Sequence, residues 1–165
     1  MTAGILTVSD RGAGGGYEDR SGPIIADLIH EYTPWQVSQQ TIVPDDFDMI
    51  ANTLRGWCAA GLNLILTTGG TGFAPRDITP EATRHIIERE APGLAEALRA
   101  ESLKVTRHAM LSRGIAGIRG RTLIVNLPGN PKAVRENMEV LLPVLPHALE
   151  LLAGTPGSET GHRSV

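Results

Sequence analysis

The sequence has a single cysteine, Cys58, so no disulfide can form within the chain. Few cysteines are typical of proteins from reducing compartments, whose folds rely on a hydrophobic core. Cys58 lies in an apolar run that is typical of a helix, and we expect it to pack as a small hydrophobic residue. The shortage of cysteine therefore predicts a cytoplasmic protein that is held together by core packing.

Basic clusters and long apolar runs are also missing. The formal charge is −3, whereas a nucleic-acid-binding surface needs a clustered excess of Lys and Arg. No apolar run approaches the roughly 20 residues that a membrane-spanning helix needs. The first predicted strand begins within five residues of Met1, which leaves no room for a signal peptide. We therefore expect neither a nucleic acid nor a membrane as a partner.

Aromatic residues make up only 4% of the chain. Stacking on an isoalloxazine ring needs aromatic side chains, so this scarcity disfavours a flavodoxin-like protein that binds a flavin. Two tryptophans and two tyrosines still leave that alternative open.

What the chain does contain is typical of one globular α/β domain. Hydrophobic residues make up 41% of its 165 residues and charged residues 20%. Strand-like and helix-like segments alternate, which predicts a mostly parallel sheet with helices on its faces. The predicted strands are 5–8, 37–43, 62–66 and 122–126. Helices are predicted to begin near Ser21, Phe47, Thr79, Gly93 and Pro131, with a break near Pro143 and Pro146, an irregular segment over 106–120 and a frayed tail over 154–165.

Every segment with chemically suggestive residues follows a predicted strand. These segments are Ser9-Asp10 with the glycine-rich loop behind it, Pro44-Asp45, Gly69–Gly72, and Pro128-Gly129-Asn130. In open parallel α/β sheets, ligands bind beyond the carboxyl ends of the strands. The four segments therefore predict a single site at that edge.

The segment Gly69-Gly70-Thr71-Gly72 places three glycines where a strand ends. Glycine lets the main chain approach a bulky anion, and consecutive amides can form an anion-binding concavity. The segment is neither a GxGxxG motif nor a P-loop, because no GK[ST] follows it. It favours a phosphate-binding loop, with a tight turn as the alternative.

Pro128-Gly129-Asn130 leads a strand into a predicted helix that begins at Pro131. The exposed amides and the positive dipole end of a helix N-terminus favour an anion. The alternative is an ordinary connection in which Asn130 caps the helix.

Asp45 and Asp77 are the carboxylates that stand out, because each lies in a loop after a predicted strand. Mg²⁺ is commonly held by one or two carboxylates together with substrate phosphates, so loop aspartates are the expected ligands for nucleotide chemistry. As alternatives, Asp45 could cap the helix near Phe47 and Asp77 could serve the helix at Thr79. Asp10 has the same ambiguity.

No other catalytic pattern is present. The five histidines show no metal-ligand spacing, and we interpret His30, His85, His108, His147 and His162 as surface or supporting residues. No GxSxG motif marks a nucleophilic serine.

Taken together, these segments resemble the Mog/MoaB family of molybdopterin-binding proteins. The resemblance runs from about residue 4 to residue 153 and is closest to the adenylyltransferase branch. The matching segments are Thr7-Val8-Ser9-Asp10, Asp19-Arg20-Ser21-Gly22-Pro23, Val43-Pro44-Asp45, Leu64–Thr83, Glu101-Ser102-Leu103-Lys104, Ala109-Met110-Leu111-Ser112-Arg113 and Asn126–Pro131.

The resemblance implies a three-layer α/β/α sandwich over residues 4–153, assembled as a homotrimer. It implies Mg²⁺-dependent transfer of AMP from ATP to molybdopterin, which yields pyrophosphate and molybdopterin-AMP. The molybdate-inserting enzyme of the same pathway would be a further partner. A non-catalytic molybdopterin-binding or scaffold protein of the same fold is the alternative.

The resemblance also implies roles for individual residues. Asp45 and Asp77 match the functional aspartates of the family, as catalytic residues and metal ligands. Ser102 and Ser112 match its pterin-side serines. Contacts to the nucleotide and its phosphates are implied for Ser9, Asp10, Gly69, Gly70, Thr71, Gly72, Pro128, Gly129 and Asn130. Lys104, Arg113 and Lys132 are the candidates for countering the charge that develops during transfer.

Overall fold

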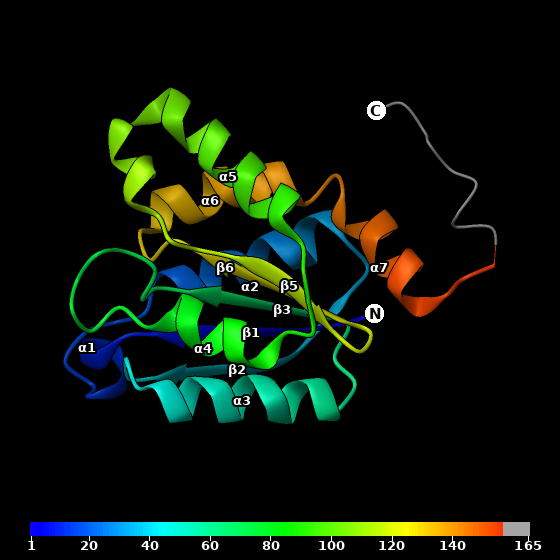
Figure 1. Cartoon of the computed structure of the whole chain (residues 1–165), viewed down its shortest axis with the longest axis horizontal. Helices are drawn as coiled ribbons and strands as arrows, with labels where there is room; N and C mark the ends of the chain where they lie inside the picture. The colour runs from blue at the N-terminus through cyan, green and yellow to red at the C-terminus, as the bar shows by residue number, and fades with distance from the viewer. Residues whose placement is uncertain (157–165) are drawn as a thin grey trace.

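A six-stranded sheet lies between two layers of helices in the computed structural model, which describes residues 1–156 (Figure 1). The strands are β1 (Thr2–Val8), β2 (Gln36–Val43), β3 (Leu64–Thr68), β4 (Arg89–Glu90), β5 (Ala116–Arg119) and β6 (Thr122–Leu127). The helices are α1 (Asp10–Ala13), α2 (Ser21–Tyr32), α3 (Phe47–Ala59), α4 (Thr79–Ile86), α5 (Pro92–Val105), the 3₁₀ helix η1 (Arg107–Leu111), α6 (Pro131–Leu141) and α7 (Leu145–Ala153).

The strand order is β2-β1-β3-β6-β5-β4. The first four strands of this order pair in parallel, whereas β5 is antiparallel to β6 and β4 is antiparallel to β5. The predicted mostly parallel sheet is thus confirmed. Because four strands run in one direction, their carboxyl ends meet at one edge of the sheet.

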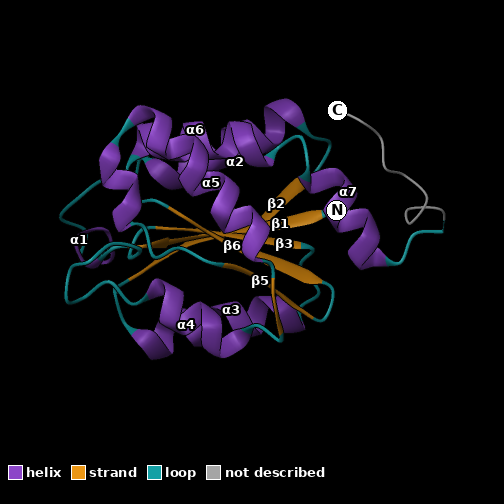
Figure 2. Cartoon of the chain, turned by 45° about the horizontal axis from the view of Figure 1, so that its top comes forward, coloured by secondary structure: helices purple, strands orange, loops and turns teal. Residues whose placement is uncertain are grey.

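Alternation along the strands divides the core between the two faces of the sheet. On β3, Leu64 and Leu66 pack in one hydrophobic cluster with Ile29 of α2, whereas Ile65 packs in the other with Leu54 of α3. Successive side chains of a strand point to opposite faces, so the fully buried strand β3 packs against both helical layers. Helices α2, α5 and α6 cover one face, and α3 and α4 cover the other (Figure 2). The implied three-layer sandwich is confirmed.

The segment predicted to be irregular, 106–120, contains η1 and the strand β5. This prediction was wrong because Gly117 gives β5 little strand character. A Cβ atom at Gly117 would lie 2.5 Å from Cδ1 of Ile87, so the close approach of the segment after α4 requires glycine there.

The predicted break near the two late prolines is confirmed, since α6 ends at Leu141 and α7 begins at Leu145 with Pro146 in its first turn. Helix α7 ends at Ala153, and Gly154 caps its C-terminus in the left-handed conformation, at φ +69°. The tail was predicted over 154–165. Residues 157–165 of this segment, which include His162, lie outside the described residues. None of the helices within 1–156 is long and apolar enough to cross a membrane.

A buried asparagine joins the elements beneath the site-bearing edge. The Nδ2 atom of Asn126 on β6 donates to the hydroxyls of Thr67 (3.0 Å) and Thr83 (2.9 Å), and its Oδ1 accepts from the amide of Ile115 (3.2 Å). Asn126 is only 4% exposed. One side chain therefore links β6, β3, α4 and the segment before β5.

We predict that Asn126→Ala lowers the free energy of unfolding by about 2–3 kcal/mol, because it leaves buried polar groups without their partner. Chemical denaturation measures this change. The exposed Asn52→Ala on α3 is the matched control and should shift stability by less than about 0.5 kcal/mol. Equal stabilities of the two variants would contradict the role of Asn126.

Candidate active site at the carboxyl ends of the strands

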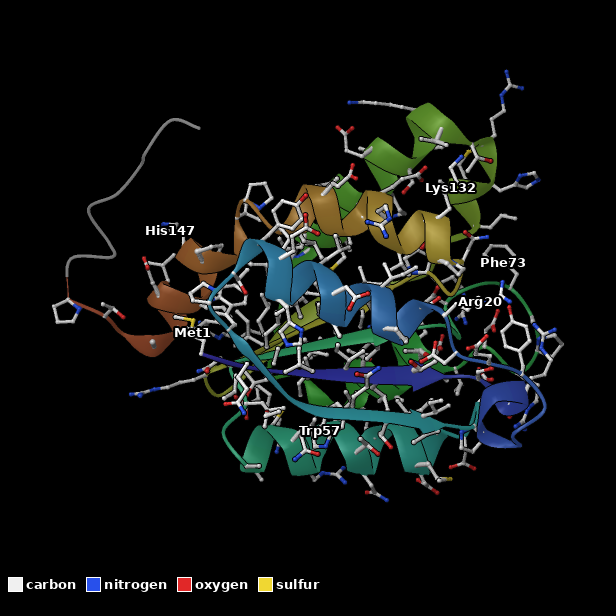
Figure 3. The ribbon with its side chains drawn as sticks, turned by 180° about the vertical axis from the view of Figure 1, so that it is seen from behind. Met1, Arg20, Trp57, Phe73, Lys132 and His147 are labelled. Atoms are coloured by element: carbon white, nitrogen blue, oxygen red, sulfur yellow. The ribbon has the colours of Figure 1, made fainter. Side chains whose placement is uncertain are left out.

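The predicted segments meet at the edge of the sheet where the parallel strands end. Main-chain bonds run from the Ser9 amide to Val43 O (2.9 Å) and from the Gly69 amide to Leu127 O (3.3 Å). The Ser21 hydroxyl donates to Gly129 O at 2.9 Å. Arg20 and Phe73 lie at this end of the molecule, opposite Met1 (Figure 3).

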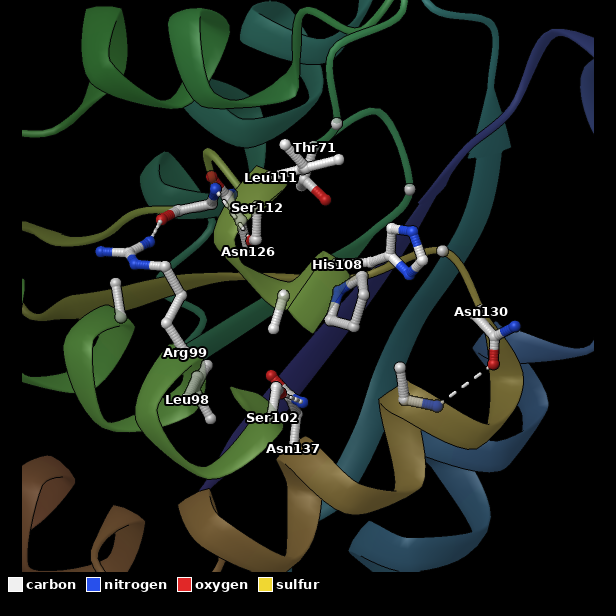
Figure 4. Close-up of a pocket in the computed structure, with 18 of the residues that line it drawn as sticks. Thr71, Leu98, Arg99, Ser102, His108, Leu111, Ser112, Asn126, Asn130 and Asn137 are labelled. Atoms are coloured by element: carbon white, nitrogen blue, oxygen red, sulfur yellow. Dashed lines mark hydrogen bonds between the residues drawn. The ribbon is translucent and has the colours of Figure 1, made fainter. Parts of the chain in front are cut away.

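Two cavities open at this edge. The first, which we call the carboxylate cavity, has a volume of about 450 Å³ and is lined by residues that include Ser9, Asp10, Asp45 and Asp77. The second, which we call the serine cavity, has a volume of about 430 Å³ and is lined by residues that include Ser102, Ser112, Thr71, Gly72, Pro128 and Asn130 (Figure 4). Gly69, Gly70, Asp77 and Gly129 line both, so the cavities share a wall.

The glycine loop presents bare amides to this wall. Gly69 and Gly70 have φ values of +96° and +63°, a conformation that side-chain-bearing residues rarely adopt. The amides of Gly70, Thr71 and Gly72 donate no hydrogen bond within residues 1–156. Successive unpaired amides of this kind suit an anion, so the loop can hold phosphate oxygens.

The turn before α6 differs from the glycine loop. Oδ1 of Asn130 accepts from the amides of Lys132 (2.9 Å) and Ala133 (3.2 Å), so the helix N-terminus is capped by its own residue. These two amides are thus not free to bind an anion. Gly129 contributes by its lack of a side chain, since a Cβ there would lie 3.2 Å from Cα of Gly69.

Asp10 and Asp45 hold each other through main-chain amides. Oδ2 of Asp45 accepts from the Asp10 amide, and Oδ1 of Asp10 accepts from the Asp45 amide, both at 3.0 Å. Arg76 donates to both oxygens of Asp10, at 2.9 and 2.8 Å. The hydrogen bond from Arg76 lowers the pKa of Asp10. Asp46, and not Asp45, caps α3 by accepting from the Met49 amide.

Asp77 is held by the loop that it ends. Its Oδ2 accepts from the amide of Ala74 at 3.0 Å, so it does not cap α4.

Burial raises the pKa of Asp45, and the negative charges of Asp10 and Asp77 raise it further. Oδ1 of Asp45 and Oδ1 of Asp77 accept no hydrogen bond within the described chain.

This pair of carboxylates fits Mg²⁺. Both offer hard oxygen ligands, and each has one oxygen that the protein leaves free. No group of three or more His, Cys, Asp or Glu that could hold a metal occurs within residues 1–156. The remaining ligands would therefore come from substrate phosphates and water, as is common for Mg²⁺.

The two predicted pterin-side serines line the serine cavity together. The Ser102 hydroxyl on α5 accepts from Nδ2 of Asn137 at 3.0 Å, which ties α5 to α6. The Ser112 hydroxyl accepts from the Gly114 amide at 3.4 Å. In each case the hydroxyl proton is left for another acceptor, which a ligand can supply.

None of the three predicted countercharges lines either cavity. Lys104 pairs with Glu101 at 2.6 Å, Lys132 has a side chain 79% exposed, and Arg113 donates to main-chain carbonyls.

Three other arginines do line the cavities. Arg11 and Arg20 line the carboxylate cavity, and Arg99 lines the serine cavity and donates to Gly114 O at 2.8 Å. None of these three arginines was predicted from the sequence. A signal was available for Arg99, since it precedes Ser102 by one helical turn and so shares its face of α5. His108 also lines the serine cavity, so it belongs to this site and not to a remote surface.

The comparison with protein families shows to which family this chain belongs. Residues 4–147 match the family described as "Probable molybdopterin binding domain". The chain belongs to this family.

Individual relatives agree with this assignment. A Helicobacter pylori protein named molybdopterin adenylyltransferase is 44% identical over 154 residues, which are 92% of this chain and 87% of that protein. The Drosophila melanogaster molybdenum cofactor synthesis protein cinnamon is 49% identical over 153 residues, 92% of this chain, but the match spans only 26% of its own length. The solved structure of the molybdopterin biosynthesis enzyme MoaB from Thermus thermophilus superposes with a TM-score of 0.88 at 54% identity, covering 94% of this chain and 98% of that one.

We predict that Gly70→Ala lowers the free energy of unfolding by about 1–3 kcal/mol, because φ is positive there. The new Cβ would also lie 2.3 Å from Oγ1 of Thr79 and 2.9 Å from Oδ1 of Asp45. Pyrophosphate affinity, measured by calorimetry, should fall about tenfold or more as the amides move. Gly56→Ala on α3 is the control. A Cβ atom at Gly56 would have no other atom of the described residues within 4 Å apart from its own helix backbone, so this change should raise the free energy of unfolding by about 0.5–1 kcal/mol.

The raised pKa of Asp45 predicts a pH-dependent stability. The fold disfavours its ionised form, so Asp45 lowers stability above its raised pKa, and this penalty vanishes below the usual value of 3.8. Asp45→Asn keeps an oxygen for the Asp10 amide. It should therefore raise the free energy of unfolding by about 0.5 kcal/mol at neutral pH, a small gain because solvent screens the charges. Denaturation curves across pH check this, and a less stable Asp45→Asn protein at pH 7 would contradict it.

Proposed function

We propose that this chain is a molybdopterin adenylyltransferase, which transfers AMP from ATP to molybdopterin and releases pyrophosphate. Relatives with that name match most of this chain and most of their own length. The observation that carries the proposal is the wall shared by the two cavities, at Gly69, Gly70, Asp77 and Gly129. Two ligands that occupy the two cavities would meet there, as a group transfer between two substrates requires.

The chemistry of the linings supports one arrangement of the substrates. The carboxylate cavity, with Asp45, Asp77 and the glycine loop, suits the triphosphate of ATP. The serine cavity adds the apolar side chains of Ala95, Leu98 and Leu111 to Ser102 and Ser112. Such a lining suits a flat pterin ring with polar edges.

In the proposed reaction, an oxygen of the molybdopterin phosphate attacks the α-phosphorus of ATP. A new P–O bond forms to that oxygen, the bond from the α-phosphorus to the bridging oxygen of the β-phosphate breaks, and pyrophosphate leaves with the electron pair. No covalent bond to the protein is needed, so catalysis consists of positioning and charge stabilisation.

The residues of this chain divide that work. The amides of Gly70, Thr71 and Gly72 donate to phosphate oxygens. Ser9, Asp10, Pro128, Gly129 and Asn130 shape the path of the phosphates, with Arg11 and Arg20 as the positive charges. Mg²⁺, held by Asp45 and Asp77 together with the phosphates, would offset the repulsion between the two polyanions.

The wider setting of the proposal comes from the family resemblance. We propose residues 4–153 as the adenylyltransferase domain, a homotrimer as the assembly and the cytoplasm as the location. The molybdate-inserting enzyme of the pathway would receive molybdopterin-AMP. Sedimentation of the purified protein measures the assembly state, and a monomer would contradict the homotrimer.

We predict that Asp77→Asn lowers the turnover number of pyrophosphate release by at least about 10²-fold, the scale of losing one preorganised electrostatic group. Molybdopterin binding should survive, because asparagine can still accept from the Ala74 amide and keep the loop in place. A pyrophosphate-release assay with ATP, in the presence and absence of molybdopterin, measures the loss.

Asp27→Asn, an exposed change on α2 away from both cavities, is the matched control and should leave turnover unchanged. Normal turnover in Asp77→Asn would refute the role of Asp77. A native protein that binds molybdopterin but releases no pyrophosphate would instead be the non-catalytic carrier.

A further inference from the structure

Arg113 lies between η1 and β5 and uses its guanidinium group entirely within the chain. Its Nε donates to Gly72 O and its Nη2 to Asp77 O, both at 2.7 Å. Its Nη1 pairs with the carboxylate of Glu81 on α4. Its main-chain amide donates to Thr71 O at 2.9 Å.

These acceptors lie at the two ends of one loop. Thr71 and Gly72 belong to the bare-amide segment, and Asp77 ends the loop with the carboxylate that lines both cavities. One planar guanidinium group therefore bonds to the main chain beside the free amides and to the main chain of Asp77. The guanidinium fixes the directions of its donors, whereas a lysine ammonium offers a single rotatable point charge.

Within the described chain, the other hydrogen bonds of the loop do not join Gly72 to Asp77. Thr79 anchors the start of the loop, with its amide on Gly70 O at 3.1 Å and its hydroxyl on Gly69 O at 2.9 Å. Within the loop, the Asp77 amide donates to Ala74 O at 2.9 Å. Among the described residues, only Arg113 bridges the Gly72 carbonyl to the Asp77 carbonyl.

We propose that Arg113 is a positioning residue that sets the distance between the phosphate-binding amides and Asp77. It lines neither of the two cavities, although it lines a third one of about 360 Å³ that shares Asp77 with both. Because its Nε, Nη1 and Nη2 are engaged by Gly72, Glu81 and Asp77, it acts on the reacting phosphates through the loop and not by contact. Glu81, in the first turn of α4, holds the guanidinium in place. This inference rests on the proposed function for its catalytic consequence, although the fastening of the loop can be tested separately.

The test compares the native protein with Arg113→Lys and Arg113→Ala. If Arg113 positions the loop, both variants lower the turnover number of pyrophosphate release by about 10²-fold, the scale of a misplacement near 1 Å. Added guanidinium ion restores part of the turnover in Arg113→Ala and none in Arg113→Lys, where the lysine stem fills the space. If Arg113 acted only as a positive charge, Arg113→Lys would keep most of the turnover, which would overturn the proposal.

Hydrogen exchange provides a second readout that does not depend on activity. The amides of Ala74, Asp77 and Thr79 are bonded within the loop, and they should exchange about tenfold faster in both Arg113 variants. Arg84→Ala is the matched control, because Arg84 also lies on an ion pair, with Glu90 at 3.4 Å, and does not contact the loop. It should change neither turnover nor exchange in the loop.

The outcomes separate the two proposals. Unchanged loop exchange in the Arg113 variants would overturn the positioning role, whatever the activity. If the native protein releases no pyrophosphate, the adenylyltransferase function is overturned. Hydrogen exchange of the loop amides then decides the role of Arg113. Should Arg113→Ala fail to fold, Arg113→Lys and Glu81→Gln carry the same comparison, the latter with a smaller effect because glutamine still accepts a hydrogen bond.

Discussion

The site depends on a close main-chain contact at two glycines, Gly69 and Gly129. A Cβ at Gly69 would lie 2.2 Å from the carbonyl oxygen of Val8, and one at Gly129 would lie 3.2 Å from Cα of Gly69. Three strand ends, from β1, β3 and β6, can therefore approach to van der Waals distance only because two glycines occupy these positions. Because the strand ends lie this close, the two cavities share a wall, and the free amides and Asp77 lie at that wall.

Much of this architecture follows from the order of residues along the chain. Apolar segments such as the predicted strand 62–66 indicate a buried parallel sheet, and a parallel sheet brings Asp10, Asp45, Gly70 and Gly129 to one edge whatever the details of packing. The strand β5 was missed because Gly117 serves a contact with Ile87, which is distant in the sequence. Local propensity carries no information about such a contact.

The finer structure of the site was predictable only in part. The strand-end loops that line the cavities were predicted, but not the three lining arginines, the pairing of Asp10 with Asp45 or the bidentate contact of Arg76. These bonds join segments that are 35 and 66 residues apart, and no spacing rule relates them. Arg113 was expected to face the phosphates because it is basic, whereas three of its donors are taken by the chain itself.

The common wall of the cavities has a consequence for what happens after transfer. A molecule made by joining two ligands across that wall would be anchored at both ends at once, and its departure would require both anchors to detach together. Linked binding of this kind multiplies residence time without any new contact. In the proposed transfer, such retention would shield the phosphoanhydride of the product from water.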